Sequence, residues 1–389
     1  MKKDTRLVST GRGDKAAPGM VNVPVYHAST IVFDTVAELN EAISGRDEHV
    51  LYYGRRGTPT QWALMDALTE LDGGAGCALY GSGLAAITGA LLAFVEAGDH
   101  VLMADTVYGP SRIFCDHGLK KLGVETTYYD PMIGAGIADL MRDNTKLVFT
   151  ESPGSLTFEV QDTAAIAAAA KAHGAWVFAD NTWATPLFFR PLDHGVDVAI
   201  QALTKYVVGH SDVMMGAAVA NERAWKRLRL GGFMHGHCAA PDDTYLALRG
   251  LRTLGVRLER HQENALKVAH WLDGRPEVHQ VLHPAFPDTP GHDFWKRDFS
   301  GATGLFSIVL KEGTDDAVAA LLDGLDHFKL GFSWGGYESL AIPSDPAQGR
   351  TATEWSAPGP LIRFHIGLED PEDLIADLDE GFRRFAAAL

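Results

Sequence analysis

Three short segments of the sequence contain residues that could bind and activate a small charged ligand. The first is Tyr80-Gly81-Ser82-Gly83-Leu84-Ala85-Ala86, which lies where an apolar run is expected to lead into a helix. Glycines leave backbone N–H groups uncovered there, and the positive end of the helix dipole favours a phosphate. A tight strand-to-helix turn explains the same glycines, so this segment alone leaves both interpretations open. A dinucleotide is disfavoured, because Ala86 stands in place of the third glycine of that fingerprint.

The second segment places an acidic residue, Asp180, at the carboxyl end of the apolar run 176–179. Open α/β sheets bind their ligands at this end of their strands. A carboxylate in such a place could pair with a ring nitrogen and keep it protonated, which an electron-withdrawing ring cofactor requires. Taken by itself, Asp180 is better explained as the cap of a turn or helix.

The third segment ends the apolar run 196–203 with a hydroxyl and an amine, those of Thr204 and Lys205. A lysine amine is a good Schiff-base nucleophile when burial and neighbouring cations lower its pKa, and Thr204 offers a hydroxyl to a phosphate. A lysine that extends from the surface into solvent is the commoner case. That alternative does not explain why the glycine loop, the acid and the lysine all fall at strand ends of one predicted sheet.

The elements that must position these residues follow from the apolar pattern. Pro59 is placed at a first helical position and opens a helix to Leu71, with Leu64 and Leu68 on the same face. Nearly continuous apolar runs are typical of strands buried on both faces, so we expect a mainly parallel sheet with helices on both sides. The runs are 77–80, 101–104, 124–129, 147–150, 176–179 and 196–203.

The chain before and after this region follows different patterns. Residues 1–58 alternate short extended pieces with turn residues and contain no strong amphipathic helix, which predicts an arm that packs on another body such as a second subunit. A long charged helix is expected over about 242–272, and strands and helices are more mixed after it. We therefore expect an N-terminal arm (1–58), a large domain (59–252) and a small α+β domain (253–389).

Composition limits the possible partners. The 389 residues carry a formal net charge of −16, and the sequence lacks the basic footprint that nucleic acids and anionic membranes require. No apolar run is long enough to span a bilayer, and the start lacks the apolar core of a secretory signal. The three scattered cysteines cannot form a closed disulfide framework. We expect a cytoplasmic protein that acts on a small molecule.

Two other clusters have structural explanations. The ligands in His235-Gly236-His237-Cys238 are too closely spaced for a known metal site and lack a second pair, so we expect no metal. Asp116-His117 and the thiol of Cys115 fall in a helical stretch, where packing or surface roles are expected instead of a catalytic dyad.

The chain resembles the Cys/Met-metabolism pyridoxal-phosphate enzymes over nearly its whole length. The resemblance implies an α/β fold of the PLP-dependent transferase-like type (aspartate aminotransferase type, fold type I). In that fold a mainly parallel seven-stranded sheet lies between helices, and a smaller C-terminal α+β domain follows. Seven motifs in the family's order carry the resemblance: Tyr52-Tyr53-Gly54-Arg55-Arg56-Gly57-Thr58-Pro59-Thr60, Ser82-Gly83, Glu151-Ser152-Pro153-Gly154-Ser155, Asp180-Asn181-Thr182-Trp183, Thr204-Lys205-Tyr206-Val207-Val208-Gly209-His210-Ser211-Asp212, Ser333-Trp334-Gly335-Gly336-Tyr337-Glu338-Ser339 and Ile362-Arg363-Phe364-His365-Ile366-Gly367.

The resemblance implies a cofactor, pyridoxal 5'-phosphate (PLP), and three catalytic residues. Lys205 would hold the cofactor as a Schiff base and then move protons between the Cα atom of the substrate and its leaving sulfur. Asp180 would pair with the ring nitrogen, and Tyr108 would stack on the face of the ring.

The phosphate of the cofactor would be held from two subunits. Tyr53 and Arg55 would reach it from a neighbouring subunit, which gives the N-terminal arm a purpose and implies a homo-oligomer, a tetramer built from dimers with shared sites. Ala202 occupies a position where several relatives have a phosphate-binding serine, so the phosphate here would depend more on Arg55 and Tyr53. Within the same chain the phosphate would be bound by Gly83, Leu84 and Thr204.

On the substrate side, Arg363 would bind the α-carboxylate of an amino acid through a bidentate pair that lysine cannot copy. Ser333, Trp334 and Tyr53 would line the same side. The implied reaction is the elimination of the β-sulfur of L-cystathionine, which gives homocysteine, pyruvate and ammonia and belongs to transsulfuration and methionine biosynthesis.

Two alternatives compete with this reaction. A γ-acting member of the family would share the cofactor and most of the site, but such members commonly carry an acidic residue just before the serine, where this chain has Phe332. A PLP-binding regulatory protein without turnover would not need a proton-transferring Lys205 or a carboxylate-binding Arg363.

Overall fold

The six apolar runs form six of the seven strands in one sheet of the computed structural model, which describes residues 1–12, 19–45 and 49–389. The strands are β1 (Gly76–Tyr80), β2 (His100–Ala104), β3 (Glu125–Tyr129), β4 (Thr145–Glu151), β5 (Trp176–Asp180), β6 (Val198–Ala202) and β7 (Gly216–Ala220). Their order is β1-β7-β6-β5-β4-β2-β3. The pairs among β2 to β6 are parallel, and β7 pairs antiparallel with β1 and β6. The predicted fold class is confirmed.

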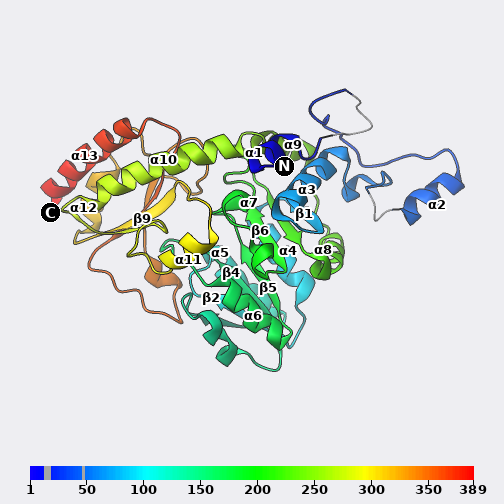
Figure 1. Cartoon of the computed structure of the whole chain (residues 1–389), viewed down its shortest axis with the longest axis horizontal. Helices are drawn as coiled ribbons and strands as arrows, with labels where there is room; N and C mark the ends of the chain where they lie inside the picture. Colours follow the sequence, from blue (N-terminus) through cyan, green and yellow to red (C-terminus); the bar gives the residue numbers. More distant parts are fainter. Residues whose placement is uncertain (13–18, 46–48) are drawn as a thin grey trace.

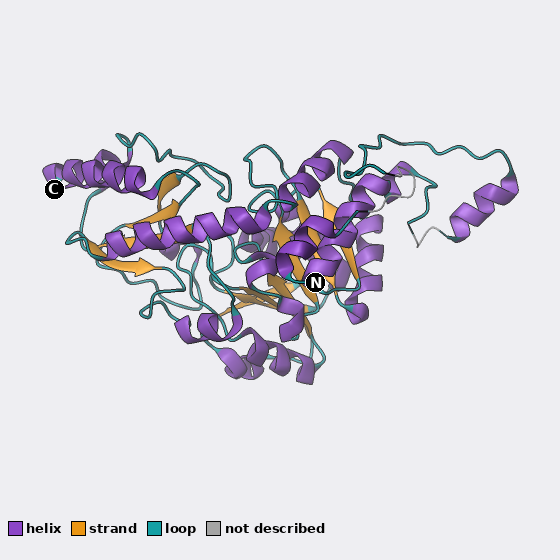
Figure 2. Cartoon of the chain, turned by 45° about the horizontal axis from the view of Figure 1, so that its top comes forward, coloured by secondary structure: helices purple, strands orange, loops and turns teal. Residues whose placement is uncertain are grey.

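Helices cover both faces of this sheet, as Figure 2 shows. The first one begins at Pro59 as predicted, because Thr58 and Gln61 form a capping box in front of it. The next one begins at Gly83, directly after the glycine loop that follows β1, and Ser82 caps it. The helices of this part are α3 (Pro59–Asp72), α4 (Gly83–Phe94), α5 (Gly109–Ile113), α6 (Thr163–His173), α7 (Thr185–Phe188), α8 (Glu222–Met234) and α9 (Pro241–Leu251).

The strand that the apolar pattern missed is β7, with the sequence Gly-Ala-Ala-Val-Ala. Glycine and alanine have low strand propensity, so the segment carries a weak signal. The close packing of β7 explains its small residues: a Cβ atom on Gly216 would lie 2.3 Å from the carbonyl oxygen of Ser82. The glycine therefore allows β7 to lie against the start of α4.

The sheet is rigidly embedded because its strands are buried on both faces. All five residues of β2 are buried, as are the large side chains of Phe149 on β4 and Phe178 on β5. Phe94 of α4 packs edge-on against Phe178, with ring centroids 4.9 Å apart. Burying an aliphatic or aromatic side chain of this size contributes about 1.5–3 kcal/mol each, so the strand ends are held in fixed places.

A second, four-stranded antiparallel sheet follows in the order β10-β11-β9-β8. Two of its helices, α12 (Asp315–Leu322) and α13 (Pro371–Ala388), lie at the opposite end of the molecule from α3 and α8, as Figure 1 shows. The elements are α10 (Leu254–Asp273), β8 (Val278–Leu282), α11 (His292–Asp298), β9 (Leu305–Leu310), α12 (Asp315–Leu322), β10 (Leu340–Ser344), β11 (Leu361–His365) and α13 (Pro371–Ala388).

Two details differ from the sequence-based expectations. The long helix expected over 242–272 is two helices, α9 and α10, because tighter bonds from Arg252 N to Arg249 O and from Thr253 N to Gly250 O end the first. The limits of the large and small domains stay a prediction. None of the described helices is long and apolar enough to cross a membrane.

The N-terminal part contains two helices where only extended pieces and turns were expected. They are α1 (Lys3–Ser9) and α2 (Val36–Ser44), and both are too short for their period to stand out in the sequence. In Figures 1 and 2, α2 lies apart from the rest of the chain. Its apolar residues Val36 and Leu39 are exposed. That this arm packs on a neighbouring subunit stays a prediction.

Candidate active site

A cavity of about 480 Å³ opens at the carboxyl ends of β4, β5 and β6. Residues from both sheets line it, which brings together positions that are more than 250 apart in the sequence. The predicted site residues on its wall are Gly83, Leu84, Tyr108, Asp180, Thr204, Lys205, Ser333, Trp334 and Arg363.

Lys205 projects into this cavity from the loop after β6. Its Nζ atom bonds to the Oγ atom of Ser333 and lies 5.2 Å from the centroid of the Trp334 ring. Burial and, in second place, the nearby charge of Arg363 together lower the pKa of Lys205 to about 8, while Asp180 opposes the shift. A substantial fraction of the amine is therefore neutral near physiological pH and able to act as nucleophile or base.

Asp180 ends β5 and is held by Thr182. The Oδ1 atom of Asp180 accepts hydrogen bonds from the backbone N–H of Thr182 (2.9 Å) and from its hydroxyl. The hydroxyl of Thr182 accepts in turn from the N–H of Ala202, 2.9 Å away. Burial raises the pKa of Asp180, although Thr182 and Lys205 act in the opposite direction. Both interpretations of Asp180 thus apply: it caps a local turn, and it presents a carboxylate to the cavity that would be stabilised by a cation.

Glu151, which the sequence analysis named only as part of a motif, is a second acid at the same place. It ends β4 and pairs with Asp180 in the strand register. Its Oε2 atom accepts from the backbone N–H of Tyr108 at 2.7 Å. Burial and the charge of Asp180 raise the pKa of Glu151 well above its usual range. The donors of Thr182 and the charge of Lys205 oppose this rise at Asp180, whereas at Glu151 the N–H of Tyr108 opposes it.

The glycine loop and Thr204 form one end of the cavity. Ser82 accepts from Ala85 N at 3.0 Å and caps α4, whereas the amides at the first two positions of the helix, Gly83 and Leu84, have no intrahelical acceptor. Both residues line the cavity. A Cβ atom on Gly83 would lie 2.4 Å from the Cβ atom of Ala202, so only glycine allows this approach. The hydroxyl of Thr204 exchanges hydrogen bonds with the backbone of Met215 at 3.0 and 3.1 Å. Thr204 would therefore have to turn its hydroxyl in order to donate to a phosphate.

Arg363 lies on β11 at the opposite side of the cavity. One Nη2 hydrogen bond fixes it to the carbonyl of Ser333 at 3.1 Å. Its Nε atom is buried and has no hydrogen-bond partner among the described residues. Burial lowers the pKa of Arg363 to about 10, so the guanidinium stays charged at neutral pH. A cationic group with unused donors is suited to bind a carboxylate.

His365, two residues further along β11, supports the turn that carries Ser333. Ser333 and Gly335 have positive φ angles of 80° and 87°. The N–H of Gly335 lies 3.1 Å from Nε2 of His365, and a Cβ atom on Gly335 would come within 2.8 Å of the backbone of Lys205. Burial keeps the pKa of His365 well below its usual range, so the ring is neutral. This role of His365 was not predicted from the sequence, because it depends on how β11 lies against the turn.

Tyr53 and Arg55 do not reach the cavity of their own chain. Tyr53 is 43% exposed, and the guanidinium of Arg55 lies 5.7 Å from the centroid of the Tyr53 ring. Arg55 donates to the carbonyl of Phe233 at 3.2 Å and lines a separate cavity of about 610 Å³. Their action on a neighbouring subunit stays a prediction.

Cys115 and Asp116 are not among the residues that line the cavity of about 480 Å³. Cys115 is buried, with its Sγ atom 3.5 Å from the sulfur of Met103, and Asp116 accepts from the hydroxyl of Tyr128 at 2.7 Å. Across the described part of the chain, no group of three or more His, Cys, Asp or Glu side chains is arranged to hold a metal ion.

Comparison with known proteins places the chain in one family. Residues 4–383 match the model of the Cys/Met metabolism PLP-dependent enzymes. The chain is 51% identical to a protein of Escherichia coli (strain K12) named cystathionine beta-lyase MetC, with 98% of each chain covered. It is 50% identical to the cystathionine beta-lyase of Salmonella typhimurium, again over 98% of each chain.

A solved structure gives the same result for the fold. The cystathionine gamma synthase of Xanthomonas oryzae pv. oryzae superposes with a TM-score of 0.90, at 35% identity and with 100% of both chains covered. Fold, motifs and full-length identity agree with each other. The chain belongs to the Cys/Met metabolism PLP-dependent enzyme family.

Proposed function

We propose that this protein is a cystathionine β-lyase, which cleaves L-cystathionine and water into homocysteine, pyruvate and ammonia. The observation that supports this proposal most is the identity of about half of all residues with proteins named cystathionine beta-lyase over 98% of the chain. The γ-acting relative with a solved structure shares the fold but only 35% of the residues.

The residues around the cavity fit PLP. The start of α4 offers backbone N–H groups to a phosphate, and Gly83 keeps that end free of a side chain. Asp180 supplies a partly buried carboxylate for a protonated ring nitrogen. Lys205, with its lowered pKa, supplies the amine that would bind the cofactor's aldehyde carbon. When bound, the cofactor withdraws electrons from the Cα atom of an attached amino acid.

The chain's own residues account for the remaining steps. Arg363 binds the α-carboxylate and fixes the amino acid in the cavity. The freed amine of Lys205 removes the Cα proton and afterwards delivers a proton to the sulfur as its bond to Cβ breaks. Ser333 accepts a hydrogen bond from Nζ of Lys205 and holds the amine close to the substrate atoms between which the proton moves. Asp180 would pair with the ring nitrogen of the cofactor and favour its protonated form.

The substrate side favours the β-position over the γ-position. A γ-elimination must also remove a Cβ proton, so it requires a longer reacting segment to be held over the cofactor. Trp334 lies beside Lys205 and narrows this side, and Phe332 offers no carboxylate for the distal ammonium group. An error of about 1 Å in such a geometry costs about a hundredfold in rate.

Product analysis with purified protein, PLP and L-cystathionine tests the proposal. Pyruvate together with homocysteine is the expected result. Predominant 2-oxobutyrate together with cysteine would assign the chain to γ-elimination, and the absence of any keto acid would favour a binding protein without turnover.

We further propose that the active enzyme is a cytoplasmic homotetramer that serves methionine biosynthesis, with sites shared between the subunits of each dimer. Two observations support a shared site: apolar residues of α2 are exposed, and Arg55 is not among the residues that line the 480 Å³ cavity of the same chain. Mixing inactive Arg55→Ala and Lys205→Ala variants under subunit exchange should restore activity, because one intact site would form per mixed dimer. Proven exchange without recovery would contradict sharing.

A further inference from the structure

Asp105 is the centre of a buried network that lies three residues before Tyr108. Its side chain is 0% exposed and accepts hydrogen bonds from a segment between β10 and β11. Three consecutive backbone N–H groups, those of residues 351–353, donate to it over 2.8 to 3.1 Å. The hydroxyl of Thr353 adds a bond of 2.9 Å. Consecutive amides directed at one anion form a nest, so Asp105 occupies an anion site made by another part of its own chain.

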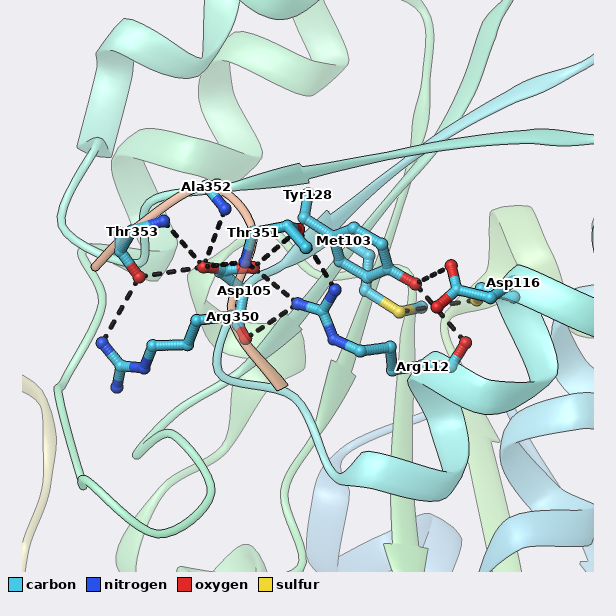
Figure 3. A network of polar contacts seen from close by, with 10 residues as sticks. Met103, Asp105, Arg112, Asp116, Tyr128, Arg350, Thr351, Ala352 and Thr353 are labelled. Carbon is cyan, nitrogen blue, oxygen red and sulfur yellow. Dashed lines mark hydrogen bonds and ion pairs between the residues drawn. The ribbon is translucent and has the colours of Figure 1, made fainter. Parts of the chain in front are cut away.

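The carboxylate of Asp105 is charged in this place. Burial by itself would raise its pKa, but the hydrogen bonds from Thr351, Thr353 and Arg112 together lower it. Arg112 pairs with Oδ1 of Asp105 and stacks on the ring of Tyr128, 3.5 Å from its centroid. Figure 3 shows Asp105 between Arg112 on one side and residues 351–353 on the other.

The same segment has a second buried attachment. The Nη2 atom of Arg350 lies 2.7 Å from Oε1 of Glu159, and both side chains are only 8% exposed. It also donates to the hydroxyl of Thr157 at 2.6 Å. Residues 154–156 and 158 line the cavity, so this attachment ends at the cavity wall. Residues 350–353 together with Asp105 and Glu159 are called the clasp below.

We infer that the clasp is a positioning device for Tyr108, with Asp105 as its central residue. Tyr108 is 45% exposed, so packing alone holds its ring weakly. Its loop is fixed instead at three points: Asp105 to residues 351–353, Thr106 O to Ser155 N at 2.7 Å, and Tyr108 N to Glu151 at 2.7 Å. With only two residues between Asp105 and Tyr108, a displaced Asp105 moves Tyr108 as well. This inference uses one part of the proposed function, namely that Tyr108 stacks on the ring of the cofactor.

A double-mutant cycle separates positioning from general support of the fold. Asp105→Asn removes the charge and turns an N–H group toward amides that need an acceptor. In the holoenzyme it should speed cofactor release by about tenfold and change the visible circular dichroism of the bound cofactor. In a Tyr108→Ala background the same substitution should change the release rate by less than about twofold, because no ring is left to position.

If Asp105→Asn does not fold, milder variants of Thr353 test the same inference. Thr353→Val removes one hydroxyl donor and should act in the same direction with a smaller effect, while Thr353→Ser keeps the hydroxyl and should behave like the unaltered protein. Arg142→Gln breaks an exposed ion pair with Glu125 on β3, the edge strand of the same sheet, and is the matched control that should leave release unchanged.

Two results would overturn the inference. One is an equal acceleration of cofactor release by Asp105→Asn with and without the Tyr108 ring. The other is an unchanged dichroism spectrum in a folded Asp105→Asn or Thr353→Val variant. Neither measurement uses cystathionine. The test of the clasp can therefore be decided even if the protein does not cleave cystathionine.

Discussion

Lys205 should react with the cofactor at a pH at which an ordinary lysine is almost fully protonated. Its pKa is lowered from 10.5 to about 8, chiefly by burial and in second place by Arg363. At pH 7 a pKa of about 8 leaves about a tenth of the amine neutral, whereas a pKa of about 10.5 leaves about one part in three thousand. Only the neutral amine attacks an aldehyde, so Lys205 should bind PLP about 300-fold faster than an exposed lysine would, other factors being equal.

The assay is the rate at which cofactor-free protein forms a borohydride-reducible link with PLP, measured from pH 6.5 to 10. Nα-acetyl-lysine measured in parallel corrects for the ionisation of PLP itself, and Lys205→Ala shows that the link belongs to Lys205. The rate should rise with a midpoint near 8. In Arg363→Met the midpoint should rise but stay closer to 8 than to 10.5, because burial is the larger cause. A midpoint near 10.5 in the unaltered protein would refute the reasoning.

Three further predictions concern other parts of the chain. Burial raises the pKa of Asp72 to about 8, so the folded state binds a proton that the unfolded state releases, and stability falls as pH rises from about 4 to about 8. Asp72→Asn should flatten this dependence by up to about 1.4 kcal/mol per pH unit in chemical denaturation, and an unaltered slope would contradict it. Gly83→Ala should weaken PLP binding at least about tenfold by its clash with Ala202, and the added change Ala202→Gly should restore binding if the clash is the cause. Arg363→Lys should lower kcat/KM for L-cystathionine about a hundredfold without altering the cofactor spectrum; an unchanged kcat/KM would remove Arg363 from the substrate site.

The site residues that could be predicted from the sequence are those that directly follow a predicted buried strand. Asp180 and Lys205 follow apolar runs, and Gly83 follows another, so a parallel sheet brings them to one edge. Their local pattern contains the information, because buried strands and glycine turns are local features. The motif resemblance added Tyr108 and Arg363, whose roles have no local pattern.

The remaining residues act through contacts that the sequence does not display. Glu151 matters because the register of β4 and β5 sets it beside Asp180, and His365 matters because β11 faces the turn at Ser333. Asp105 meets its partners almost 250 residues later. The predicted roles of Tyr53 and Arg55 depend on another subunit, so the structure of a single chain does not display their contacts.

The hydroxyl of Thr182 has a further consequence for proton placement. Its oxygen accepts from the N–H of Ala202, so its own hydrogen is directed to Asp180. The three groups form a one-way chain that begins at a backbone amide of β6 and ends on a carboxylate of β5, and each bond polarises the next. The chain therefore favours the charged form of Asp180 and opposes the rise of its pKa. Glu151 instead accepts from the backbone N–H of Tyr108, so the two neighbouring acids have their charged forms stabilised by different parts of the chain.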